Sequence, residues 1–140
     1  MAPWETLPHA TDLRVRVTGR DRVELFRDGA RSVFELSARP RAAWPAALES
    51  RWIHVEAPDE TALFRRLLSE CLFEFESDGF LARDVAIEQL DDRECRARLE
   101  GACFAPDELL VDHVIKAVTW HGLKIRASPD GVGAEVLHDL

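Results

Sequence analysis

The sequence lacks any long uninterrupted apolar run. No stretch of its 140 residues approaches the roughly 18 uncharged apolar residues that a membrane-spanning helix requires. The first residues, MAPWETLPHATD, also lack the basic and apolar regions of a secretory signal peptide. We therefore expect a cytoplasmic protein that has no membrane partner.

Cysteine is scarce. The chain has three cysteines, Cys71, Cys95 and Cys103, and none of them forms a C-x-x-C pair. An odd count without such pairs supports neither a disulfide framework nor a zinc site built from thiolates. We interpret all three as small buried hydrophobic side chains.

Positive charge is in the minority, because 18 Lys and Arg residues stand against 26 Asp and Glu residues, for a net charge of −8. Nonspecific binding to a phosphate backbone needs Lys and Arg clustered on one face, so we expect no direct contact with nucleic acid. The 46% hydrophobic content is enough for a core in a chain of this length. We expect a single domain over residues 1–140, and a monomer.

Two helices are indicated in the first part of the chain. Leu13–Thr18 alternates apolar and polar residues, as a half-buried strand does. Asp21 and Glu24 then resemble a capping box ahead of a helix that extends to about Leu36. After a connection over residues 37–50, Arg51–Ala57 is strand-like, and Asp59 caps a second apolar-periodic helix that stops at Ser77-Asp78-Gly79.

Strands dominate the rest of the sequence. Leu81–Leu90 and Arg93–Cys103 read as a hairpin joined by a turn at Asp91-Asp92. A polar loop at residues 104–112 precedes a β-branched and aromatic run, Val114–Arg126, and a last strand, Ala134–Leu137. The order β-α-β-α-β-β-β-β predicts an α+β domain with two main helices and one mixed, largely antiparallel sheet.

Four segments together resemble the archease family. The most specific is Ile115–Leu123, IKAVTWHGL, which matches the family's Lys-Ala-Val-Thr-Tyr-His-Gly-Leu signature with Trp120 in place of tyrosine. The other three are Pro8-His9-Ala10-Thr11-Asp12, which is close to the family's Asp-His-Thr-Ala-Asp opening, then Leu67–Phe75 running into Asp78-Gly79, and the C-terminal Val136–Leu140. The resemblance spans nearly the whole chain.

The resemblance implies a metal site. On its own, Asp12 reads as a turn residue before a strand. In archeases, however, this aspartate holds a divalent metal ion together with the acidic penultimate residue and the terminal carboxylate, which correspond to Asp139 and Leu140. Three carboxylate donors without a thiolate suit calcium or magnesium and not zinc, and calcium is the expected ion.

Lys116 has two interpretations. If residues 114–126 form a strand, its parity groups it with Val114, Val118 and Trp120, as an edge lysine whose stem covers apolar surface. The resemblance instead implies that Lys116 engages or activates a partner ligase. We interpret His121 and His9 as turn or core residues with no catalytic role, and Cys71 as a core residue.

The function implied by the resemblance is not enzymatic. Archeases act as chaperone-like cofactors of an RtcB-type RNA ligase, promoting its guanylylation and its multiple turnover in tRNA splicing and RNA repair. The sequence contains no Gly-rich phosphate loop and no zinc-ligand spacing. Two alternatives stay open, a metal-dependent hydrolase using Asp12 and Asp139 and a general holdase chaperone.

Overall fold

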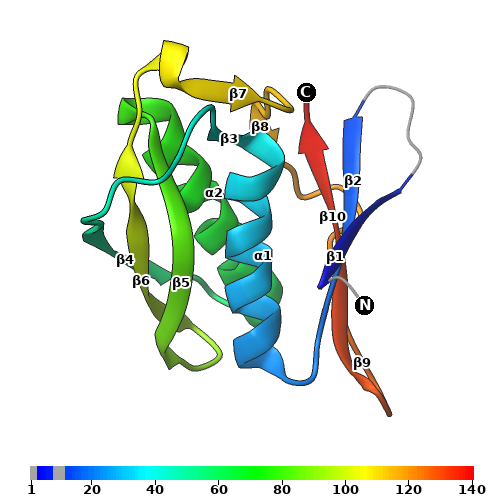
Figure 1. The fold of residues 1–140 in the computed structure, drawn as a ribbon. Helices are drawn as coiled ribbons and strands as arrows, with labels where there is room; N and C mark the ends of the chain where they lie inside the picture. Colours follow the sequence, from blue (N-terminus) through cyan, green and yellow to red (C-terminus); the bar gives the residue numbers. More distant parts are fainter. Residues whose placement is uncertain (1–2, 8–11) are drawn as a thin grey trace.

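Two helices lie between two antiparallel sheets (Figure 1). The computed structural model describes residues 3–7 and 12–140. Within these ranges the helices are α1 (Arg22–Ser37) and α2 (Glu60–Asp78), with a short 3₁₀ turn, η1, at Pro106–Glu108. The strands are β1 (Trp4–Leu7), β2 (Asp12–Gly19), β3 (Ala38–Pro40), β4 (Glu49–Glu56), β5 (Phe80–Leu90), β6 (Glu94–Cys103), β7 (Leu109–Val111), β8 (Ala117–Val118), β9 (Ile125–Ser128) and β10 (Gly131–Asp139).

The α+β class with two main helices and largely antiparallel strands is confirmed, but the strands form three sheets where one was expected. The strands divide into a five-stranded sheet of β1-β2-β10-β8 with β9 also paired to β10, a three-stranded sheet of β4-β6-β5, and the pair β3-β7. Every pairing in the described part of the chain is antiparallel. The division has a physical cause in α1, which buries residues on more than one side and must therefore be covered by a sheet on each side.

Both helices start at the predicted caps. The Asp21 carboxylate accepts a hydrogen bond from the Glu24 amide (2.9 Å), and the Asp59 carboxylate accepts one from the Ala62 amide (2.8 Å). The predicted capping box differs in one bond, because Glu24 accepts from the Arg20 amide and not from that of Asp21. Helix α2 ends as predicted, with Gly79 in the left-handed region at φ 73°.

A close approach of the helices sets the centre of the core. A Cβ atom added at Gly29 of α1 would lie 2.6 Å from Cε1 of Phe64 on α2. The Phe64 ring packs edge-on against Phe26, with centroids 5.1 Å apart, and both side chains are fully buried. Only glycine allows this contact, so Gly29 fixes the spacing of α1 and α2.

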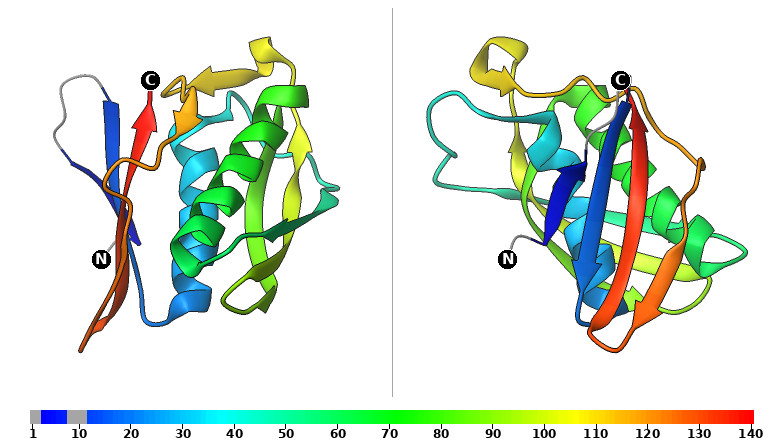
Figure 2. Two further views of the ribbon diagram at one scale, coloured as in Figure 1. Left: turned by 180° about the vertical axis from the view of Figure 1, so that it is seen from behind. Right: turned by 90° about the vertical axis from the view of Figure 1, so that its right-hand side faces the viewer.

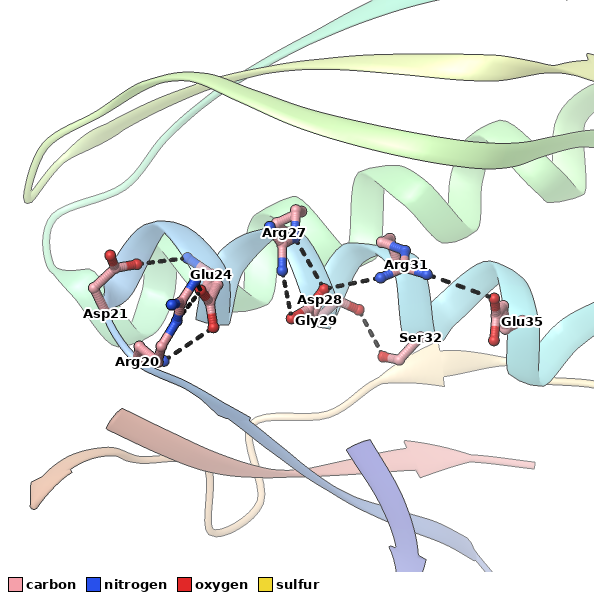
Figure 3. A network of polar contacts seen from close by, with 9 residues as sticks. All are labelled: Arg20, Asp21, Glu24, Arg27, Asp28, Gly29, Arg31, Ser32 and Glu35. Carbon is pink, nitrogen blue, oxygen red and sulfur yellow. Dashed lines mark hydrogen bonds and ion pairs between the residues drawn. The ribbon is translucent and has the colours of Figure 1, made fainter. Parts of the chain in front are cut away.

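A buried carboxylate lies on the side of α1 that faces the five-stranded sheet (Figure 3). Asp28 accepts hydrogen bonds from Arg27 at 3.0 and 3.1 Å and from Arg31 at 3.1 Å. The Arg31 guanidinium also lies 5.5 Å from the centre of the Trp4 ring on β1. The two arginines thus compensate the burial of Asp28, and Arg31 ties α1 to the edge of the sheet.

The hairpin of β5 and β6 is confirmed. The Asp91 carboxylate accepts from the amides of Arg93 and Glu94, both at 2.8 Å, which is the side-chain-to-backbone bonding that favours aspartate in turns. In contrast, the expected loop at residues 104–112 contains η1 and β7, and β7 pairs with β3 from the expected connection at residues 37–50. Short strands of three residues leave too little periodicity to be read from sequence.

The run Val114–Arg126 is not one strand. Only Ala117–Val118 and Ile125–Ser128 are extended and paired, and between them lies a turn in which Gly122 has φ 70°. The last strand, Gly131–Asp139, is longer than the expected Ala134–Leu137. The β-branched residues made the run look continuous, but the turn at Gly122 interrupts it.

Candidate metal-binding site

Asp12 and Asp139 lie directly opposite each other. Strands β2 and β10 pair in an antiparallel register that makes Asp12, the first residue of β2, the Cα partner of Asp139, the last residue of β10. Their neighbours Leu13 and His138 are buried on the inner face. Since successive side chains of a strand point to opposite faces, both aspartates point away from the helices. Opposed Cα atoms in such a ladder are about 4.5–5.5 Å apart, which allows two carboxylates to share one cation.

Leu140 follows Asp139 at the same corner of the molecule. Figure 2 places the carboxyl end of β10 beside the start of β2. Leu140 is 37% exposed, so solvent reaches the end of the strand. The register thus brings the three residues implied by the resemblance to one end of the five-stranded sheet.

Lys116 joins this corner through its backbone. Its amide donates to the Asp139 carbonyl oxygen over 2.7 Å, immediately before the ladder in which Ala117 pairs with Asp139. The Lys116 side chain is exposed, and no ion pair of its ammonium occurs within the described residues. The prediction that Lys116 shares one strand face with Val114 and Val118 is wrong, because Val118 is buried while Val114 is 69% exposed. The strand β8 is only two residues long, so no alternation extends from Val114 to Trp120.

His138 lies behind the two aspartates, on the inner face of the sheet. It is fully buried on the inner face of β10, opposite Leu13, and neither ring nitrogen has a hydrogen-bond partner within the described part of the chain. Burial lowers the pKa of His138 to about 4, so the imidazole is neutral near pH 7. His138 therefore adds no charge behind the aspartates, and sequence inspection gave no signal for its burial.

Trp120, the aromatic residue of the signature segment, contacts Arg65 of α2. The Arg65 guanidinium lies 4.3 Å from the centre of the Trp120 ring, and Arg65 Nε donates to the Val118 carbonyl oxygen (3.1 Å). Trp120 is 53% exposed. His121 lies in the exposed turn that follows, as one of its two interpretations expected, while His9 falls outside the described residues.

Two of the three cysteines match their interpretation. Cys71 and Cys95 are buried, and burial raises the pKa of Cys95 to about 11 and that of Cys71 further. Cys103 is exposed, contrary to expectation, because it ends β6 at the molecular surface. There Arg51 donates to its sulfur over 3.1 Å.

The fold and the corner site define a small α+β protein in which β2 and the last strand, β10, pair side by side, so that Asp12 lies opposite Asp139. The family model of the archease protein family (MTH1598/TM1083) matches residues 4–140, and the chain belongs to this family. No helix within the described residues combines the length and apolarity needed to cross a membrane.

Relatives and solved structures agree with this assignment. The chain is 30% identical to a protein archease of Methanopyrus kandleri over 99% of both chains, and 30% identical to that of Thermococcus kodakarensis over 94% of this chain and 93% of the relative. Its fold is similar to the solution structure of Methanobacterium thermoautotrophicum protein 1598, with a TM-score of 0.77, 23% identity and full coverage of both chains. It is also similar to a Thermotoga maritima archease described as a possible chaperone, with a TM-score of 0.63, 15% identity and coverage of 97% and 96%.

Proposed function

We propose that this protein is a cytoplasmic, non-catalytic activator of an RtcB-type RNA ligase, which promotes guanylylation of the ligase and its multiple turnover in tRNA splicing and RNA repair. The proposal rests on membership of the archease family over residues 4–140. It assigns the protein no substrate of its own, and RNA is reached only through the ligase. The net charge of −8 favours a protein partner over direct contact with a phosphate backbone.

One observation carries the proposal further. The residues that the resemblance singles out come from the beginning, the late middle and the end of the chain, yet Asp12 and Asp139 are Cα partners and the Lys116 amide bonds to Asp139. A lysine ammonium and two carboxylates at one solvent-facing corner can contact a metal ion and a polar partner surface together. The convergence therefore supports a functional corner.

The donor set fits a hard divalent cation. Asp12, Asp139 and the terminal carboxylate of Leu140 would hold the ion, and all their donors are oxygens, which suits calcium. Two carboxylates at opposed positions repel each other, and a shared cation would offset this repulsion at the paired strand ends. The ion would supply positive charge at the corner, and Lys116 would add its ammonium beside it.

Multiple-turnover ligation tests the proposal. A cognate ligase is given RNA with 2′,3′-cyclic phosphate and 5′-hydroxyl ends, with GTP, and with or without substoichiometric amounts of this protein. We expect the protein to increase both the ligase-guanylate formed and the number of turnovers, and to neither ligate RNA nor hydrolyse GTP alone. Unchanged ligase rates would contradict the proposal, as would GTP hydrolysis by the protein itself.

A further inference from the structure

A second group of metal-ligating side chains lies on the outer face of the three-stranded sheet. His54 and Glu56 lie two residues apart on β4, and Glu94 at the start of β6 is the Cα partner of Glu56. One nitrogen or oxygen ligand atom from each side chain lies within 4.8 Å of the other two. No other trio of His, Cys, Asp or Glu converges in this way within residues 3–7 and 12–140.

The local sequence fixes the direction of these side chains. Ile53 and Val55 are buried at 5% and 3% exposure, so the alternation of β4 turns His54 and Glu56 outward. Glu94 is held by its amide, which donates to Asp91 in the hairpin turn. The trio therefore stands on two paired strands and not on a loop.

Charge at this place is poorly balanced. Glu56 and Glu94 face each other across the strands, an arrangement of like charges that destabilises a sheet. Their one side-chain polar partner among the described residues is His54, whose Nε2 lies 2.6 Å from Glu94 and 3.8 Å from Glu56. The nearest arginine in register, Arg96 opposite His54, has its guanidinium 5.3 Å from the centre of the Trp52 ring.

The lining of the adjoining hollow carries more negative than positive charge, and Arg22 pairs with its Asp92 at 3.6 Å. An open hollow of about 740 Å³ beside the trio is lined by Glu56, Glu94, Asp91, Asp92 and one cation, Arg93, together with Ala57. A small cation entering this hollow meets carboxylates from both strands and from the turn. Its field favours a divalent ion over an anion or an apolar ligand.

We propose that His54, Glu56 and Glu94 bind a divalent first-row transition metal ion, with zinc as the defining probe. An imidazole with two carboxylates suits zinc and leaves a coordination position for water, whereas the all-oxygen corner at Asp139 suits calcium. The ion replaces the hydrogen bond between His54 and Glu94 with bonds to the metal. It joins β4 to β6 at the hairpin end, and this site does not depend on the ligase proposal.

Zinc titration calorimetry tests the proposal on untagged protein that carries Cys103→Ser, which removes the exposed thiol as a competing ligand. We expect one zinc equivalent to bind to this parent. His54→Ala and Glu94→Gln should each raise the dissociation constant at least tenfold. His121→Ala removes an exposed histidine outside the trio and should leave the affinity unchanged. Melting in EDTA checks that each variant folds as the parent does.

A crossed comparison separates the two metal sites. Asp139→Asn should lose most of the calcium-dependent rise in melting temperature and keep the zinc affinity of the parent, while His54→Ala should do the reverse. Failure of calcium binding alone would leave the zinc site standing. Equal zinc affinity in His54→Ala and the parent, or no zinc binding by the parent, overturns the proposal.

Discussion

Asp139→Asn should change the stability of the protein in opposite directions without and with calcium. Asp12 and Asp139 are directly opposed on the outer face of the five-stranded sheet. Two unit charges about 5 Å apart repel by about 0.8 kcal/mol at the dielectric constant of water, and physiological salt screens part of this repulsion. In EDTA the neutral amide should therefore raise the free energy of unfolding by a few tenths of a kcal/mol, which corresponds to about 1–2 °C in melting temperature.

Calcium should reverse the order of the two proteins. At a calcium concentration of about 100 times its dissociation constant, binding to the folded state adds about 2.7 kcal/mol to the parent, or roughly 8–10 °C in melting temperature. The substitution replaces one of three charged donors with a neutral amide, so affinity should fall about tenfold or more, equivalent to about 1.4 kcal/mol. The variant should thus be the more stable protein in EDTA and the less stable one in calcium.

Thermal melts followed by circular dichroism, in EDTA and over a calcium titration, provide the assay. Asp130→Asn is the matched control, because it removes an exposed carboxylate from the turn between β9 and β10. It should respond to calcium as the parent does. If Asp139→Asn lowers stability in EDTA and still shows the parental calcium response, the two carboxylates do not share an ion and the reasoning is refuted.

Three further predictions follow from the same structure. Lys116→Ala should remove most of the ligase activation but keep the melting temperature within a few degrees, because the side chain is exposed. The control Lys124→Ala should keep both, and equal losses of fold and activation in Lys116→Ala would make Lys116 structural. Residues appended after Leu140 should weaken the calcium response and the ligase activation, while an N-terminal extension should leave them intact; identical calcium melts would remove Leu140 from the site. Gly29→Ala should lower the free energy of unfolding in urea by about 1–2 kcal/mol, because the cost of overpacking against Phe64 exceeds the gain in helix propensity of about 1 kcal/mol. A more stable variant would mean that the two helices can move apart to accept the methyl group.

The sequence by itself determined the helices and their limits. Asp21, Asp59 and Gly79 act through bonds to residues three or four positions away, so their signals lie within a few letters of the sequence. The β5–β6 hairpin is local in the same sense, because Asp91 bonds to its own turn. The family resemblance also depended on linear motifs and named Asp12, Lys116, Asp139 and Leu140.

The division of the strands between two sheets was decided by the tertiary structure. A strand carries a period of two whichever sheet it joins, so the pattern of Leu13–Thr18 did not say that β2 would pair with β10 and not with β4. That choice is visible only in the folded chain, where β2 pairs with β10 and packs against one part of α1 while β5 packs against another. The short partners β3 and β7, and the two-residue β8, exist only because distant segments supply their hydrogen bonds.

The two candidate metal sites also differ in how much of each the sequence shows. The motifs contain Asp12 and Asp139 at opposite ends of the chain, and only the register of β2 with β10 makes them partners. His54, Glu56 and Glu94 carry no motif at all, since two strands separated by α2 and β5 bring them together. The sequence gives the residue types, but the proximity that a candidate metal site requires comes from long-range strand pairing.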